Sequence, residues 1–149
     1  MINEDLKLRG DVAIVLKDKN GNVKESREIN NLVVTAGLTF ICARMAAASA
    51  DVMSHMALGS GTTAAAAGDT DLESILGSRE ALDSSTASNN TITYVSSFEA
   101  GEGTGAVTEA GIFNAATSGT MLCHVIFPVV NKQADDTMSV TWTITLTAS

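Results

Sequence analysis

The last stretch of the chain alternates strictly between apolar and polar residues. From Thr137 to Thr147, every odd-numbered position is Ser or Thr, and every even-numbered position is Met, Val, Trp, Ile or Leu. Successive side chains of a strand point to opposite faces, so this period predicts a half-buried antiparallel strand. The even face carries Trp142, the only tryptophan, and other strands must cover it. The odd face is uncharged and suits either water or a second protein surface.

Shorter apolar stretches, separated by Gly, Asn and Ser turns, predict further strands. They are residues 6–16, 23–29, 53–58, 78–82, 91–98, 107–113 and 120–127. The first two flank an Asn20-Gly21 pair, which is a strong signal for a β-hairpin. The last is expected to stop at Pro128, because proline has no amide hydrogen to donate to a ladder. Residues 84–90, rich in Ser and Asn, predict a turn region.

One segment has a helical pattern instead. Thr35 is a suitable N-cap for a helix that runs to about Ala47. Its apolar residues recur at helical spacing and are Leu38, Ile41, Cys42 and Met45. We expect this apolar face to lie on a sheet or to close one end of a sandwich. A shorter helical turn is predicted over residues 71–76.

These elements predict a mainly β fold, an antiparallel β-sandwich or jelly roll, with one short helix inserted near residues 35–47 and an N-terminal β-hairpin. The hairpin differs in composition from the rest of the chain. Residues 1–34 are therefore expected to form a docking arm, and residues 35–149 the sandwich, within a single compact domain overall.

Charge is distributed unevenly along the chain. Residues 1–34 hold six basic and six acidic groups, whereas residues 35–149 hold three basic and eleven acidic groups and account for the formal net charge of −8. Phosphate binding needs clustered Lys and Arg, so this acidic surface argues against nucleic acid or an anionic membrane as a direct partner. The charged residues of the predicted strand at 23–29 also disfavour pairing of that strand with a strand of another molecule.

The opening of the chain is polar and acidic, unlike the basic and apolar start of a signal peptide. The longest apolar run of the whole sequence is far shorter than the ~20 residues that span a bilayer. Two cysteines allow at most one bridge, whereas secreted scaffolds of this size normally use more. We therefore expect the chain to be made, and first to fold, in a reducing cytoplasm.

Two Cys and two His raise a zinc hypothesis that involves Cys42, His55, Cys123 and His124. Geometry argues against it, because Cys123 and His124 are neighbours in a strand and point to opposite faces. No metal or other cofactor is predicted. Both cysteines are expected to be small buried hydrophobic residues, where free Cys usually lies.

The strand at 120–127 is apolar on both faces, with His124 between Leu122 and Ile126. One face is expected to meet the core and the other a second sheet or another subunit. We expect His124 to be a hydrogen-bonded core or interface histidine, because no neighbouring carboxylate or nucleophile motif gives it catalytic work.

The glycine-rich segments do not match nucleotide-binding motifs. Gly59-Ser60-Gly61 lacks the Lys of a phosphate loop, and the Gly101-x-Gly103-x-Gly105 stretch is followed by no amphipathic helix. Both are interpreted as mobile turns. No nucleophile elbow is present either, and the paired carboxylates lie in predicted loops. The sequence therefore predicts a protein that is not an enzyme.

Several segments resemble a family of small bacteriophage virion proteins. They are Asn-Leu-Val-Val-Thr-Ala-Gly-Leu at 31–38, Met-Ala-Leu-Gly-Ser-Gly-Thr-Thr at 56–63, Asp-Thr-Asp-Leu at 69–72, Glu-Ala-Gly-Ile-Phe-Asn at 109–114 and Val-Thr-Trp-Thr-Ile at 140–144. The resemblance covers roughly residues 31–147 and leaves the opening hairpin outside. Ala64–Ala67 stand where such proteins often carry a Pro.

The resemblance implies a virion structural protein. One placement is a capsid decoration (cement) protein on the outer surface of the capsid, a trimer whose partners are the major capsid protein and itself, and the scarcity of aromatic residues favours this placement. The alternative is a tail or baseplate-associated fibre or receptor-binding module that recognises a host glycan. Such a module needs exposed aromatic residues to stack on sugars, whereas Trp142 and Tyr94 belong to predicted core faces.

Two sets of contact residues are predicted for the cement role. The capsid contacts are expected in the basic N-terminal hairpin, at Asn3, Leu6, Lys7, Arg9, Lys19 and Asn20. The oligomer interface is expected on either the second face of strand 120–127 or the hydroxyl face of the last strand, at Leu122, His124, Ile126, Thr141, Thr143 and Thr145. The residues alone leave the choice between these faces open.

Overall fold

The computed structural model describes residues 5–46 and 50–148, which form nine strands and one helix. In chain order these are β1 (Leu6–Lys17), β2 (Val23–Val33), α1 (Thr35–Ala46), β3 (His55–Gly59), β4 (Glu80–Ala81), β5 (Ser84–Ser88), β6 (Thr91–Phe98), β7 (Gly105–Phe113), β8 (Met121–Lys132) and β9 (Thr137–Ala148). The predicted mainly β, antiparallel fold with one short helix is confirmed.

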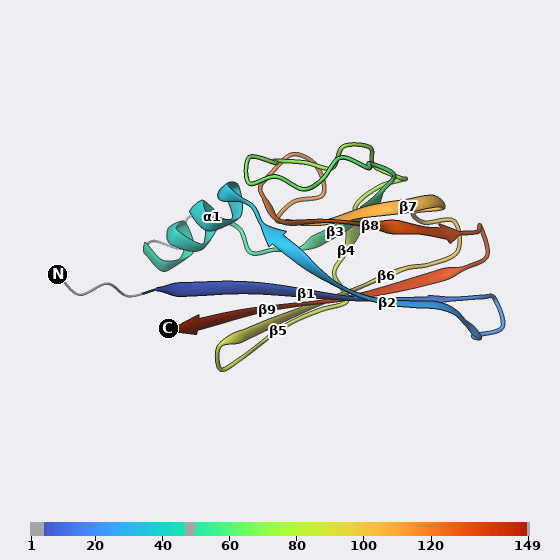
Figure 1. Cartoon of the computed structure of the whole chain (residues 1–149), viewed down its shortest axis with the longest axis horizontal. Coiled ribbons are helices and arrows are strands. Elements are labelled where there is room, and N and C mark those ends of the chain that lie inside the picture. The colour runs from blue at the N-terminus through green and yellow to red at the C-terminus, as the bar shows by residue number, and fades with distance from the viewer. Residues whose placement is uncertain (1–4, 47–49, 149) are drawn as a thin grey trace.

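All nine strands belong to one sheet, in the order β4-β3-β7-β8-β2-β1-β9-β6-β5. The sheet curls into a half-barrel, so that β3, β7 and β8 lie above β1, β9, β6 and β5 (Figure 1). β2 crosses from the lower layer to the upper one, where Leu32 and Val33 pair with β8. At the opposite margin, the Leu82 amide bonds the Ser54 carbonyl and the Asp83 amide bonds the Val95 carbonyl, so the chain crosses back there.

The core fills the space between the layers. Trp142 is fully buried, as the alternating pattern of β9 predicted, and burial raises the pKa of the nearby Tyr94 hydroxyl to about 12. Around them pack the other apolar side chains of the inner faces, among them Val12, Ile14, Leu16, Met56, Leu58, Phe98, Ile112, Cys123, Val125, Met138, Val140 and Ile144. The two layers therefore share one hydrophobic core.

The N-terminal hairpin does not project as the separate arm predicted from its composition. β1 lies in the interior of the sheet and pairs with β9 from Leu6↔Ala148 to Lys17↔Thr137. Its even-numbered residues Val12, Ile14 and Leu16 are buried in the core. Because alternate residues of β1 are buried in the core, the hairpin is part of the sheet, although its charge differs from that of the rest of the chain.

Two strands are longer than predicted. β2 continues through the Asn30-Asn31 pair to Val33, because alternate side chains still face the core. β8 continues past Pro128 to Lys132, because the β7–β8 register shifts between Val107 and Glu109 and leaves Pro128 at a bulge. The Pro128 carbonyl accepts a hydrogen bond from Arg27 Nη1 at 2.9 Å.

Three local predictions are wrong. Residues 84–90 were expected to be a turn and instead contain β5, while residues 71–76 form no helical turn. Helix α1 has the predicted start but a different buried face: Gly37 is buried, Leu38 is 41% exposed and Met45 is 81% exposed. A Cβ at Gly37 would collide with the backbone of Leu122, so close packing on β8 sets the helix rotation.

Within the described ranges, the helix is too short and insufficiently apolar to cross a bilayer.

Candidate functional site

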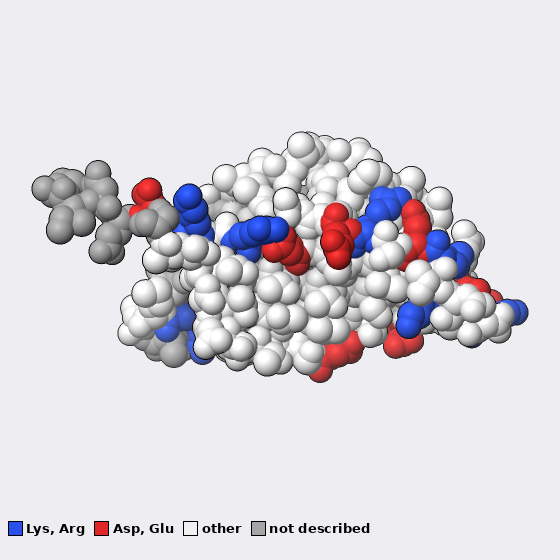
Figure 2. All heavy atoms as spheres, turned by 60° about the horizontal axis from the view of Figure 1, so that its bottom comes forward, with Lys and Arg blue, Asp and Glu red and all other residues white. Residues whose placement is uncertain are grey.

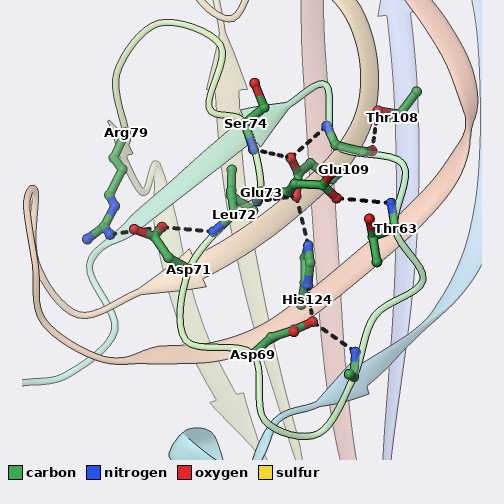
Figure 3. Close-up of polar contacts among 12 residues, drawn as sticks. Thr63, Asp69, Asp71, Leu72, Glu73, Ser74, Arg79, Thr108, Glu109 and His124 are labelled. Atoms are coloured by element: carbon green, nitrogen blue, oxygen red, sulfur yellow. Dashed lines mark hydrogen bonds and ion pairs between the residues drawn. The ribbon is translucent and has the colours of Figure 1, made fainter.

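The outer face of the upper layer carries two buried ionisable side chains. Glu109 on β7 and His124 on β8 alternate with core residues on these strands and so point away from the core. The segment over them, residues 60–76, is here named the cover loop (Figure 3). Glu109 is fully buried and His124 is 3% exposed, so the cover loop seals both from solvent.

Glu109 is held by backbone amides of the cover loop. Its carboxylate accepts hydrogen bonds from the amides of Gly61 at 2.7 Å, Glu73 at 3.0 Å and Ser74 at 2.9 Å. Burial on its own raises the pKa of the Glu109 carboxyl, but these amides and His124 outweigh it and hold the pKa below its ordinary value. Glu109 is therefore an ionised anchor for two separate points of the loop.

His124 lies between two carboxylates (Figure 3). Its Nε2 is 2.9 Å from Glu109 Oε1 and its Nδ1 is 2.7 Å from Asp69 Oδ2. The Ala66 amide lowers the pKa of the Asp69 carboxyl most, burial opposes it, and His124 lowers it further. Ionised carboxylates only accept hydrogen bonds, so the doubly protonated imidazole is the form that satisfies this geometry at both ring nitrogens. Asp69, His124 and Glu109 are here named the clamp.

Glycines let the cover loop approach the clamp. A Cβ at Gly61 would collide with the Glu109 carboxylate, and one at Gly59 would lie 2.6 Å from it. The interpretation of Gly59-Ser60-Gly61 as a mobile turn is therefore wrong: Gly59 ends β3, and Gly61 is buried and hydrogen bonded. Thr108 Oγ1 adds a hydrogen bond to the Gly61 carbonyl at 2.6 Å.

The cover loop also shields apolar side chains. Leu72 and Ala36 pack on a second, smaller cluster formed by Val34, Ala57, Phe113 and Met121. Beside this cluster, Arg79 stacks 3.6 Å from the ring centre of Phe113 and donates to the Ala115 and Ser118 carbonyls. The second apolar face of β8 is thus covered by its own chain, rather than by another subunit.

This arrangement corrects part of the predicted oligomer interface. Leu122 and His124 are each 3% exposed within a single chain, so they have no surface to offer a partner. Ile126 is partly exposed. The prediction that His124 is a buried, hydrogen-bonded histidine is confirmed, but the statement that no carboxylate lies near it is wrong.

The clamp has the carboxylate–histidine pairing of a general base, but both imidazole nitrogens are engaged. Accepting a substrate proton requires a free ring nitrogen, and in this arrangement both ring nitrogens are hydrogen bonded. A pocket of about 220 Å³ opens beside it, lined by Thr63, Ala64, Asp69, Asp71, Glu73 and His124. Its carboxylates give it a negative lining.

The structure does not bring the four zinc candidates together. Cys123 is buried in the core, where burial raises the pKa of its thiol, while His124 lies on the opposite face of β8. Cys42 is exposed on α1, contrary to the prediction that it is buried. His55 contacts Ser54 Oγ at 2.8 Å. Among the described residues, no group of three His, Cys, Asp or Glu side chains could hold a metal ion.

A second candidate surface lies on the outer face of the lower layer. Thr141, Thr143 and Thr145 of β9 are half-buried there, and their cross-strand neighbours on β6 are Val95, Thr93 and Thr91. The same rows continue onto β5 as Ser84, Thr86 and Ser88. We name this uncharged area of β5, β6 and β9 the hydroxyl face. Figure 2, which turns the lower side of Figure 1 toward the viewer, shows a row of Lys, Arg, Asp and Glu side chains across the molecule.

A groove of about 450 Å³ runs where the hydroxyl face meets β1 and β2. Arg9, Asp11, Glu28, Thr141 and Thr143 are among its lining residues. It brings one predicted capsid contact, Arg9, next to two predicted oligomer contacts. Arg9 is paired with Asp11 at 3.0 Å, so part of its charge is already balanced.

The other predicted capsid contacts do not form one patch. Leu6, Lys7 and Arg9 are exposed at the start of β1, whereas Lys19 and Asn20 are exposed at the turn beyond its far end. A strand of this length separates the two groups by roughly 40 Å. Asn3 lies outside the described residues.

Comparison with known proteins finds no matching family model, no similar curated protein and no matching solved structure.

Proposed function

We propose that the chain is a structural protein of a bacteriophage virion that binds the assembled shell and stabilises it as a cement protein. The sequence resemblance suggests the class. The adhesive role is supported by the shape of the outer face of the lower layer. There the hydroxyl face and the groove beside Arg9 form one broad surface across five strands. Such a surface suits contact with another protein more than enclosure of a small substrate.

The proposed mechanism is mechanical. A protein that binds only the expanded shell stabilises that state by mass action, in proportion to its binding free energy and copy number. The clamp supports this role, because it keeps the cover loop in place without an open catalytic group. The proposal includes the finer architecture of a β-sandwich or jelly roll, supported by the two layers that pack face to face over one core.

A glycan-binding module of the tail or baseplate is the alternative. The polar side chains in the groove favour it, since Arg9, Asp11 and Thr143 offer both donors and acceptors. It lacks the aromatic platform on which sugars usually stack, because Trp142 and Tyr94 are buried in the core. We therefore favour the cement role.

The test is binding of the purified chain to shells stripped of it, followed by co-sedimentation. Thr143→Lys places a long charged side chain in the middle of the groove, opposite Asp11, and is expected to weaken shell binding at least about tenfold, because its bulk fills the groove and its charge must be desolvated at the contact. Thr117→Lys, in an exposed turn of the upper layer, is the matched control and should bind normally.

Normal shell binding by Thr143→Lys would exclude this docking surface. Counting copies in intact virions separates the two roles, because symmetry gives on the order of hundreds of copies for a shell protein and about a dozen or fewer for a tail protein. A low count would favour the glycan-binding alternative.

A further inference from the structure

The sheet ends at a strand with an open side. β5 pairs with β6 on one side only, and it is the last strand in the sheet order of the described chain. All five of its residues, Ser84–Ser88, are exposed. Alternate residues of an edge strand direct their N–H and C=O groups away from the sheet, so β5 offers backbone donors and acceptors to a further strand.

This edge lacks the features that normally prevent pairing. Ser84, Ser85, Thr86, Ala87 and Ser88 include no charge and no proline, and their register with β6 runs without a bulge. The opposite edge is different, because β4 has only two residues and one of them is Glu80. Charges, prolines, bulges and short strands are the usual protection of sheet edges. Here only one of the two edges is protected.

We propose that β5 pairs antiparallel with β5 of a second copy of the chain, across a two-fold axis at Thr86. Two copies that each carry a net charge of −8 repel one another over most of their surface, so an uncharged edge is where they can approach. Pairing about Thr86 sets Ser84 opposite Ser88, and Ser85 opposite Ala87, of the partner. Each pair is small and uncharged, so neither bulk nor charge opposes the contact.

The residues on either side of β5 take no part in this pairing, because Asn89 lies in the β5–β6 turn with a φ of 52° and the Asp83 carboxylate already accepts a hydrogen bond from Ser97 Oγ at 2.6 Å. The outward hydroxyl rows of β5 continue without interruption into the second sheet, and cross-strand Thr pairs are favourable. The contact is two-fold and predicts a dimer in solution, in contrast to the trimer that the sequence resemblance implied.

The mass of the full chain in solution tests this proposal directly. Sedimentation and light scattering over a wide range of concentration should show twice the mass of one chain. Thr86→Lys puts two like charges opposite each other at the axis and is expected to raise the dimer dissociation constant at least about tenfold. Thr93→Lys is the matched control, because it lies on the same cross-strand row of the hydroxyl face but on β6. Mixing Thr86→Lys with Thr86→Glu should restore the dimer as a mixed pair.

A cysteine variant tests the register. In a Cys42→Ser background, Thr86→Cys should form a disulfide-linked dimer on mild oxidation, because directly opposed residues lie ~4.5–5.5 Å apart and within disulfide range. Thr93→Cys should not. A wild-type chain that stays monomeric, or equal loss of dimer in Thr86→Lys and Thr93→Lys, overturns the proposal. Neither result affects the shell-binding proposal, which is measured on stripped shells with the Thr143 variant.

Discussion

Glu109 has four hydrogen-bond donors around a fully buried carboxylate, and three of them are backbone amides of the cover loop. The sequence contained a sign of this, because Glu109 is the only charged residue in an apolar strand. Its partners could not be predicted, since Gly61, Glu73 and Ser74 are distant in the sequence and meet it only when the cover loop packs on β7. Side-chain periodicity identified the face of His124, but not what lies on that face.

The clamp makes His124 the most sensitive polar residue of the upper layer. His124→Gln removes the cation between two carboxylates and leaves Glu109 buried without its charged partner. Removing one member of a buried ion pair costs about 3–5 kcal/mol of unfolding free energy, so we expect a loss of this size in denaturant titrations.

His55→Gln is the matched control for this change. His55 is half-buried, and its ring hydrogen bonds Ser54 Oγ and lies near Glu80 without a direct ion pair among the described residues, so its replacement should cost less than about 1 kcal/mol. Equal free energies of unfolding for the two variants would show that the clamp does not stabilise the fold.

Elements with one buried face were predicted well, and elements without one were not. β9 alternates along most of its length, β6 places Ile92, Tyr94 and Phe98 on one face, and the bounds of both match the predicted strands closely. β5 was missed because all its residues are exposed, so burial imposes no alternation and its Ser-rich composition indicates a turn. Part of the cover loop was predicted to be a helical turn, and its role depends on contacts with β7 and β8 that local pattern does not reveal.

Attachment of the cover loop should depend on pH. Asp69, Asp71 and Glu73 on the loop, Glu109 on β7 and His124 on β8 are the titratable groups that face one another here. The pKa values of Asp69 and Glu109 are lowered in the folded chain, so these groups bind protons more weakly than in the unfolded one. Their stabilising effect is therefore fully present above their ordinary pKa of about 4, and it is lost as the pH falls through the lower folded values.

Hydrogen exchange, corrected for the intrinsic effect of pH, can follow this loss. Between neutral pH and pH values below about 4, the Gly61, Glu73 and Ser74 amides should lose protection first, because they donate directly to Glu109. The amides of Ile14 and Val140, in the paired β1 and β9, should remain protected over the same range. Simultaneous loss at both places would mean that acid unfolds the whole chain rather than releasing the loop.

At the scale of the whole molecule, β2 and the crossing after β4 join the two layers at both margins. If the N-terminal hairpin were the separate docking arm predicted from its composition, deletion of residues 1–9 would leave the fold intact. In the structure that deletion removes the pairing of Leu6–Arg9 with β9. Loss of shell binding after such a deletion would therefore not distinguish a lost docking surface from a destabilised fold. Single substitutions of exposed residues separate the two effects.

A shared core predicts that both layers unfold together. Trp142 is buried in the lower layer and Cys123 in the upper one, and burial raises the pKa of the Cys123 thiol, so each reports on its own layer. In a Cys42→Ser background, the loss of native Trp142 fluorescence and the onset of Cys123 labelling by a thiol reagent should occur at the same denaturant concentration. Labelling of Cys123 while Trp142 is still native would show that the upper layer opens separately. The two layers would then be distinct cooperative units, despite the strand that joins them.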